Sequence, residues 1–291
     1  MRFPFRVRVP QEHVNKVARA ALREDISRGD ITSSLVIPPG LVHRAEARVK
    51  AKGVIAGLGV FRAVFKAYDD STTVRFLCRD GDGVRKGQVL AEVMGRARSI
   101  LTCERVALNF LQHLSGIATE TAAFVRRVRG TGVRIIDTRK TTPMLRLLEK
   151  YAVAQGGGYN HRPSLSHLVM IKDNHVEAAG GLEEAVGRAR KGLAARGRRL
   201  LVEVEVCPGT DLSRLDGLPV DIVMLDNFPV GDLKKAISYL RRLRRRPYVE
   251  VSGGVSLDNV RKIAMCGPDF ISIGHITHSA PSLDIGLDFG G

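Results

Sequence analysis

Five cationic side chains fall into three short segments of the sequence. Arg139 and Lys140 stand in DTRKTTP, His161 and Arg162 end GGGYNHR, and Lys172 stands in IKDNH. Arginine binds planar carboxylates through two parallel hydrogen bonds, whereas lysine acts as a point charge for carboxylate or phosphate. Cations gathered around one cavity would repel one another unless a multiply charged anion joined them. The pattern therefore predicts a binding site for a ligand with several negative charges.

Acidic side chains recur at the ends of two neighbouring predicted strands. Glu203 and Glu205 are two positions apart in VEVEV, so both point to one face, which is the lumen if the strand belongs to a barrel. A buried carboxylate is costly unless it is paired with a cation or a metal. Glu205 and Asp226 are therefore predicted to share a Mg²⁺ ion, and Glu203 to pair with a lysine or arginine below. An internal salt bridge to Lys172 or Lys140 is the alternative.

Two glycine turns follow the last two predicted strands. VSGGVSLDN joins a strand to a helix that Ser256 could cap, and SIGH forms the second turn. Glycine lets backbone N–H groups approach an anion, and the positive end of a helix dipole adds to the attraction. One glycine pair alone is more often a plain turn. The phosphate site of (β/α) barrels is commonly built from the loops after the final strands, so the two turns together favour a 5′-phosphate site.

The elements that would position these residues alternate between strand and helix. The strand cores are VRIIDT, HLVMIKD, RLLVEVEV, DIVMLDN, YVEVS and FISIG, with helical segments between them. Such alternation implies parallel pairing, and a closed (β/α) barrel is the simplest architecture. Active sites of these barrels lie at the carboxyl ends of the strands, and nearly every predicted strand ends in a polar or glycine cluster. The sequence thus predicts one converging site.

The first part of the chain carries a different pattern. Residues from about 43 to 98 are predicted to form strands with glycine turns between them, and helices are predicted over about 11–29 and 99–114. Pro143 suits the first turn of a further helix, which the glycines at 156–158 would end. The strand-rich segment is expected to be a small sandwich with a structural role.

We therefore predict an α/β protein of two domains. Residues 1–115 would form an N-terminal α/β sandwich domain and residues 116–276 a C-terminal (β/α) barrel. The tail at about 277–291 would pack back on the first domain. A chain of 291 residues, 44% of them hydrophobic, can bury a core of this size.

Charge and cysteine content narrow the class of protein. Lys and Arg number 46 against 30 Asp and Glu, and the net charge of +16 favours anionic partners. The basic run RRLRRR ends a predicted helix, and without basic–aromatic interleaving it indicates a solvated helix end rather than a nucleic-acid site. The four cysteines form no CxxC pair, which argues against zinc and gives no disulfide framework. With no signal-peptide pattern or membrane-length apolar stretch, we expect a cytoplasmic protein without membrane or specific nucleic-acid partners.

Several of these segments together resemble one known family. In chain order, EDISRGDITS, ERVALNFLQHLSGIAT, DTRKTTP, GGGYNHR, IKDNH, VEVEV, MLDNF and VSGG are similar to the signatures of quinolinate phosphoribosyltransferase, also called carboxylating nicotinate-nucleotide pyrophosphorylase. This is a type II phosphoribosyltransferase family. The likeness runs through most of the chain, and several motifs are too long for coincidence.

The resemblance implies a reaction and a set of substrate ligands. Quinolinate and phosphoribosyl pyrophosphate would give nicotinate mononucleotide, pyrophosphate and CO2 in de novo NAD biosynthesis, with Mg²⁺ required. The residues implied to hold the two quinolinate carboxylates are Arg139, His161, Arg162 and Lys172, with Thr138 and Lys140 beside them. Glu205 and Asp226 would hold the metal and the ribose pyrophosphate. The implied catalytic residues are Lys140, Lys172, Glu205 and Asp226.

The resemblance also implies a phosphate cradle and a subunit partner. The residues implied to hold the 5′-phosphate are Ser252, Gly253, Gly254, Ile273, Gly274 and His275. Arg105 stands on the long predicted helix, outside the barrel strands. In the family the matching arginine reaches into the active site of the neighbouring subunit, so a homodimer or a larger homo-oligomer is expected.

Two departures from the family pattern and three alternatives remain. Met144 stands where the family usually has glycine, and the loop at 163–167 differs from its commoner form, which could change the affinity for quinolinate. The molybdenum-associated ModD-like paralogues share the fold, but DTRKTTP and IKDNH follow the quinolinate pattern. A nicotinate-specific transferase would have no use for so many carboxylate-binding cations. A basic nucleic-acid-binding protein is suggested only by the net charge.

Overall fold

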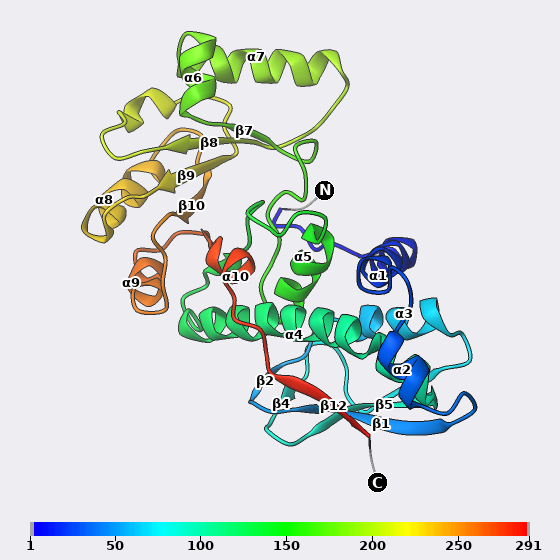
Figure 1. Ribbon diagram of the computed structural model, residues 1–291. Coiled ribbons are helices and arrows are strands. Elements are labelled where there is room, and N and C mark those ends of the chain that lie inside the picture. Colours follow the sequence, from blue (N-terminus) through cyan, green and yellow to red (C-terminus); the bar gives the residue numbers. More distant parts are fainter. Residues whose placement is uncertain (1–2, 290–291) are drawn as a thin grey trace. The chain divides into compact units, whose positions relative to one another are not determined.

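The computed structural model describes residues 3–289 of the chain (Figure 1). These residues divide into two compact units, each made of segments that are distant in sequence. The first unit contains residues 3–5, 123–139 and 159–274. The second unit contains residues 6–122, 140–158 and 275–289. Within residues 3–289, no helix combines the length and the apolar character that crossing a membrane requires.

The first unit is built on six parallel strands, which confirms the six strand cores predicted from the sequence. They are β6 (Arg134–Ile136), β7 (Val169–Ile171), β8 (Val202–Val206), β9 (Ile222–Asp226), β10 (Tyr248–Ser252) and β11 (Phe270–Ser272). Their order is β6-β11-β10-β9-β8-β7, the order of neighbours around a barrel. Among the described residues the ladder is open between β6 and β7.

Helices alternate with these strands along the chain (Figure 1). They are α6 (Asp173–Ala179), α7 (Leu182–Ala195), the short 3-10 helix η1 (Leu212–Leu215), α8 (Val230–Leu240) and α9 (Val260–Met265). Each longer helix has one apolar side. In α8, for example, Leu233, Ile237 and Leu240 are buried at helical spacing. Burial of such stripes against a parallel sheet is what stabilises this architecture.

The second unit contains an antiparallel sheet of order β12-β1-β5-β3 and a separate pair of strands. The sheet strands are β12 (Ile285–Phe289), β1 (Val42–Val49), β5 (Val89–Arg96) and β3 (Thr73–Phe76), and the pair is β2 (Gly53–Val54) with β4 (Gly83–Val84). The strand near the C-terminus, β12, pairs with β1 from Ala45 opposite Phe289 to Val49 opposite Ile285.

The helices of the second unit include the longest in the chain. They are α1 (Gln11–Asp25), α2 (Ile31–Val36), α3 (Leu58–Tyr68), α5 (Arg146–Gln155), α10 (His275–His278) and the first part of α4 (Ala97–Arg127). The predicted stripe Ala107, Leu111, Leu114 and Ala118 of α4 is fully buried. A Cβ on Gly116 would lie 2.1 Å from the Pro281 carbonyl oxygen, so the chain leading to β12 packs directly on this helix.

Several predicted boundaries were wrong. The first helix ends at Asp25 rather than near residue 29, and the long helix continues to Arg127 rather than ending near 114. The helix after DTRKTTP begins at Arg146, because Pro143 lies in a preceding turn, although it ends before the glycines as predicted. A polar turn closed by Asn259 precedes α9, so Ser256 does not cap that helix.

The strand prediction for about 43–98 missed helix α3. Six of its eleven residues are buried, among them Phe61, Val64 and Phe65. A short apolar run of aromatic and β-branched residues is typical of a strand as well as of a buried helix. The helix packs against α1. Tertiary packing therefore decided a segment whose composition alone favoured a strand.

Candidate functional site

The carboxyl ends of β7 and β8 meet in a salt bridge. The Lys172 ammonium, directly after β7, donates to Glu205 Oε2 near the end of β8. The parallel register that pairs Ile171 with Val204 brings these two residues level with each other. This contact confirms the internal salt bridge that the sequence offered as an alternative for Glu205. It also holds a carboxylate and a cation together at the edge where substrate chemistry is expected.

The last residue of β9 places a second carboxylate close by. Asp226 is half-buried, and its Oδ2 accepts a hydrogen bond from Asn227 Nδ2 at 2.8 Å. Burial and then the charges of Asp226 and Glu205 raise the pKa of the Cys207 thiol, which follows β8. The two carboxylates thus both lie near the Cys207 thiol, at the carboxyl ends of adjacent strands. An all-oxygen pair of this kind fits Mg²⁺, which takes one or two carboxylates and completes its shell with phosphate oxygens and water.

The glycine turn after β10 is packed tightly. Gly253 and Gly254 have φ values of +85° and +60°, and a Cβ on Gly253 would lie 2.1 Å from Asn227 Oδ1. Only glycine fits there without moving the neighbouring loop. Helix α9 begins only at Val260 and has six residues, so the glycine turn lies several residues before the helix. Any anion at this turn would depend on backbone N–H groups of the turn itself.

Two guanidinium groups lie near each other beside these strand ends. Arg162 is only 7% exposed, and its Nη1 donates to the Leu168 carbonyl at 3.2 Å. Burial, and next the positive charge of Arg139, lower the pKa of Arg162, while Glu203 and Glu205 act in the opposite direction. Two like charges held together in a partly buried place favour an anionic ligand. This arrangement agrees with the multiply charged anion that the sequence predicted.

The carboxylate of DTRKTTP has a structural task that sequence reasoning missed. Asp137 is fully buried, its Oδ1 accepts the His161 backbone N–H at 2.8 Å, and its Oδ2 accepts Asn160 Nδ2 at 2.7 Å. The Asn160 backbone in turn exchanges two hydrogen bonds with Phe5. Asp137 therefore ties the loop that carries the second cationic pair to the end of β6. The position of Asp137 directly after an apolar strand was the feature of the sequence that could have indicated this role.

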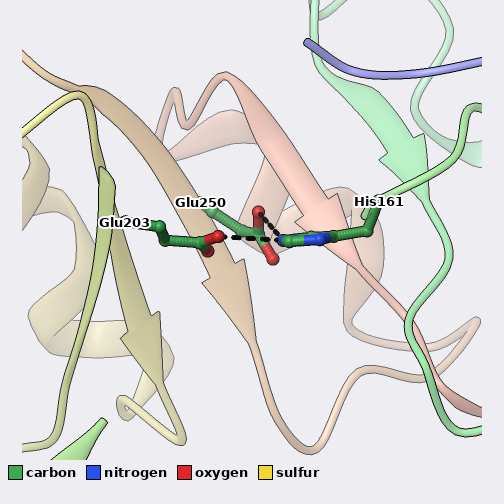
Figure 2. A group of neighbouring side chains, drawn as sticks. All are labelled: His161, Glu203 and Glu250. Atoms are coloured by element: carbon green, nitrogen blue, oxygen red, sulfur yellow. Dashed lines mark ion pairs between the residues drawn. The ribbon is translucent and has the colours of Figure 1, made fainter. Parts of the chain in front are cut away.

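His161 lies inside the unit rather than at an open rim. Its Nε2 is 3.1 Å from Glu203 Oε2 on β8 and 3.5 Å from Glu250 Oε2 on β10, and Figure 2 shows both carboxylates turned toward the ring. The prediction that Glu203 pairs with a lysine or arginine was wrong, because a histidine from a distant loop takes that place. Glu250 was not singled out from the sequence. Its signal was an acidic residue between two buried valines of YVEVS.

The position of the ring proton follows from the contacts of His161. Burial disfavours a charged ring, but the charges of Glu203 and Glu250 outweigh it and raise the pKa of His161. Nδ1 accepts the Arg162 backbone N–H at 2.6 Å, so this nitrogen carries no hydrogen of its own. The hydrogen therefore lies on Nε2, facing the carboxylates. Burial also raises the pKa of Glu203, so the ring and this carboxylate compete for one proton, and the contact at Nδ1 favours its place on the carboxylate.

Three of the predicted site residues belong to the second unit. Lys140 is exposed, and its carbonyl oxygen accepts from Thr277 Oγ1 at 2.7 Å. His275 is exposed, with its Nε2 3.5 Å from Glu120 Oε1. Arg105 is an exposed residue of α4 that lines a cavity of about 380 Å³. The remaining predicted residues, which belong to the first unit, are Thr138, Arg139, His161, Arg162, Lys172, Glu205, Asp226, Ser252, Gly253, Gly254, Ile273 and Gly274.

Met144 has a backbone conformation that glycine adopts more readily than methionine does. Its φ is +67°, in the left-handed region that side chains with a Cβ rarely adopt, and the residue is 78% exposed. Because the side chain points into solvent, the chain tolerates methionine at a modest conformational cost.

Comparison with known proteins gives consistent matches over nearly the whole chain. The family models for the N-terminal and C-terminal domains of quinolinate phosphoribosyl transferase match residues 30–115 and 117–288. The carboxylating nicotinate-nucleotide pyrophosphorylase of Mycobacterium leprae is 44% identical over 275 residues, which are 93% of this chain and 95% of the relative. The decarboxylating quinolinate phosphoribosyltransferase 1 of Nicotiana glauca is 38% identical, over 96% of this chain and 83% of its own length.

A solved structure agrees with these matches. The nicotinate-nucleotide pyrophosphorylase from Francisella tularensis superposes with a TM-score of 0.92 at 36% sequence identity, and the match covers 99% of this chain and 100% of that one.

Replacing Asp137 with asparagine is expected to destabilise the protein. An amide keeps one acceptor oxygen but places an NH2 group against a donor, either Asn160 Nδ2 or the His161 N–H. The free energy of unfolding, measured by urea denaturation, should fall by about 1–3 kcal/mol. The control Asp70→Asn, at a side chain that is 96% exposed, should change it by less than about 0.5 kcal/mol. Equal effects of the two substitutions would show that Asp137 does not hold the loop.

Proposed function

The chain belongs to the quinolinate phosphoribosyltransferase family, and we propose that it transfers the phosphoribosyl group of phosphoribosyl pyrophosphate to quinolinate. Loss of CO2 then gives nicotinate mononucleotide, with pyrophosphate as the other product, for NAD biosynthesis. The observation that carries the proposal is the pair of neighbouring guanidinium groups of Arg139 and Arg162. Quinolinate has carboxylates on adjacent ring carbons, and a pair of forked cations complements such a dianion.

The quinolinate site would be built from the cations around the carboxyl ends of β6 and β7. Arg139 and Arg162 would take the two carboxylates, with Lys172 as a point charge and Thr138 and Lys140 beside them. The role of His161 would be indirect, because its ring nitrogens face Glu203, Glu250 and the Arg162 amide. We infer that the histidine positions this clamp instead of gripping the substrate.

The phosphoribosyl donor would lie across the ends of β8 to β11. Glu205 and Asp226 would hold Mg²⁺ together with oxygens of the donor, and the metal would supply charge neutralisation for the departing pyrophosphate. The 5′-phosphate would approach the glycine turn after β10 and the Ile273–His275 segment. The Ile273 amide is already bonded to the Ile136 carbonyl, so the neighbouring positions would have to provide the donors.

The reaction needs positioning and electrostatic stabilisation more than covalent help. As the bond from the anomeric carbon to pyrophosphate breaks, the ribose acquires positive charge, which the carboxylates of Glu205 and Asp226 stabilise. Lys140 and Lys172 would balance the charge of the leaving group. The quinolinate nitrogen attacks the anomeric carbon and becomes a positively charged pyridinium. The bond to the adjacent carboxylate then breaks, CO2 leaves, and the ring carbon retains the electron pair and takes up a proton.

The assembly and location of the enzyme are proposals of the same kind. We infer a homodimer in which Arg105 of each subunit enters the other subunit's site, because this exposed arginine lies on α4, outside the barrel strands. All four cysteines are free thiols. Free thiols agree with a cytoplasmic location, where the reducing environment keeps them in that form.

The direct test of the function is an assay of the purified protein. Quinolinate labelled in the carboxylate next to the ring nitrogen, phosphoribosyl pyrophosphate and Mg²⁺ should give labelled CO2 and nicotinate mononucleotide in equal amounts. Chelation of the metal should stop the reaction, and added Mg²⁺ should restore it. Turnover of nicotinate in place of quinolinate, or no release of CO2, would contradict the proposal.

Arg139→Ala should abolish turnover while leaving the protein folded. The substitution removes one guanidinium from the clamp, and loss of a charged partner to a carboxylate should lower kcat/KM for quinolinate by at least about 100-fold. Arg242→Ala, an exposed position in the basic run, serves as the charge-matched control and should keep wild-type activity. Comparable activities of the two variants would remove Arg139 from the site.

Mixing two inactive variants tests the shared site. Arg105→Ala and Arg139→Ala homodimers should each be inactive. A heterodimer of the two has one site with both arginines intact, so an equal mixture that exchanges subunits should recover about a quarter of wild-type activity. No recovery, despite heterodimers detected by native mass spectrometry, would place Arg105 and Arg139 in the same subunit's site.

A further inference from the structure

The interior of the first unit contains acidic oxygens without ordinary partners. Glu203 and Glu250 are both fully buried, the first at the second residue of β8 and the other at the middle of β10. Apart from their ion pairs with His161, their four carboxylate oxygens have no hydrogen-bond partner among residues 3–289. Buried carboxylates without several hydrogen bonds cost stability, and sheet interiors ordinarily carry apolar residues. Two of them aimed at one imidazole therefore call for a functional explanation.

The backbone N–H and both ring nitrogens of His161 have polar contacts that fix its orientation. Its backbone N–H donates to Asp137 Oδ1, its Nδ1 accepts the Arg162 amide, and its Nε2 faces the two carboxylates. The edge of the Phe3 ring packs against the imidazole, with the ring centres 5.3 Å apart. A histidine that needed only to fill the core would not require this set of directional contacts.

The contacts of His161 connect the acidic interior to the cationic clamp. The Arg162 amide that donates to Nδ1 belongs to the residue whose guanidinium lies near Arg139. Rotation of the imidazole would remove this acceptor and release the backbone at Arg162. Clamps that bind two carboxylates at once depend on angles, and a displacement of about 1 Å can cost about 100-fold in rate.

We propose that Glu203 and Glu250 are positioning residues for quinolinate: from inside the barrel they orient His161, and through its Nδ1 they fix Arg162 for binding of the second carboxylate. This role rests on the proposed function, since it assigns a task to residues behind the same site. Neither glutamate touches the substrate.

Two phenylalanines near the N-terminus complete the surroundings of His161. Phe5 forms an antiparallel bridge with Asn160, and Phe3 packs edge-on against both His161 and Phe270, at 5.3 and 4.9 Å between ring centres. Phe3 also lines a cavity of about 540 Å³ at the amino ends of β6, β10 and β11. Its ring therefore lies between solvent-accessible space and the histidine. Removing the ring would extend the cavity toward the buried carboxylates.

The same three side chains could alternatively hold a metal ion, since one ligand atom from each lies within 4.8 Å of the others. The contacts of these side chains favour a proton over a metal ion between them. The Nε2 hydrogen already fills the space between the ring and the carboxylates, and Arg162 supplies positive charge nearby. A buried site closed by Phe3 also lacks an entry path for an ion.

The test compares Glu250→Gln with Glu184→Gln, which removes the same charge from an exposed position of α7. Glutamine keeps the size of Glu250 but not its charge. In Glu250→Gln we expect the KM for quinolinate to rise about 10- to 100-fold while the KM for phosphoribosyl pyrophosphate stays within about twofold. The control should change neither. An unchanged KM for quinolinate in folded Glu250→Gln, or an equal rise in both KM values, would overturn the proposal.

Imidazole ¹⁵N spectra of histidine-labelled protein give a readout that does not need turnover. The His161 signals, identified by their absence in His161→Gln, should show hydrogen on Nε2 and none on Nδ1 in the wild type, and Glu250→Gln should lose this fixed form. If the wild-type enzyme failed to convert quinolinate, the function would be refuted while the spectra still tested the orientation of the ring. A stoichiometric metal ion lost in Glu250→Gln would overturn the positioning role.

The Phe3→Ala substitution tests the positioning of His161 by removing the ring that packs against it. It keeps both carboxylates and should raise the KM for quinolinate by about 3- to 10-fold, with little effect on the donor KM. If Glu250→Gln failed to fold, this variant would decide the question alone, and an unchanged KM for quinolinate would overturn the proposal.

Discussion

Two neighbouring guanidinium groups set the electrostatic constraint on which the proposed site depends. Arg162 is almost completely buried, and burial first and the positive charge of Arg139 second lower its pKa. Water screens such a pair poorly, so an anion that bridges both cations gains much more than it would at the open surface. A ligand with adjacent carboxylates relieves the repulsion at both groups, whereas a monocarboxylate relieves only part of it. The proposed selectivity for a dianion rests on this arrangement of charges.

The parallel architecture explains how distant segments of the chain meet at this place. Each strand delivers its last residues to the same edge of the sheet: Lys172 after β7, Glu205 near the end of β8 and Asp226 at the end of β9. The loop with the second arginine is held from behind, by Asp137 and by the buried carboxylates under His161. Rigid support of this kind keeps a charged site assembled before substrate arrives, so that little ordering entropy is lost on binding.

The sequence predicted the parts of this arrangement that are local. Strand cores, polar strand ends and the common face of Glu203 and Glu205 follow from periodicity and parity. The partner of Glu203 did not follow, because His161 comes from a loop far away in sequence and no local rule reveals that contact. The contact of Glu250 with His161 was missed for the same reason, and nothing in the sequence around Phe3 indicated that it packs against this histidine. Helix α3 was missed because its buried residues are mostly aromatic or β-branched, as in a strand, although the exposed Arg62 and Lys66 lie four residues apart on one helical face.

The most direct measurement is a crystal structure of the protein with quinolinate and Mg²⁺. The account predicts that one carboxylate lies within hydrogen-bond distance, about 3 Å, of the Arg139 guanidinium and the other within the same distance of Arg162, with the ring nitrogen turned toward Glu205 and Asp226. Density for the acid at another place, or a bound ring whose carboxylates avoid both arginines, would contradict the claim that the paired charges exist to hold this substrate.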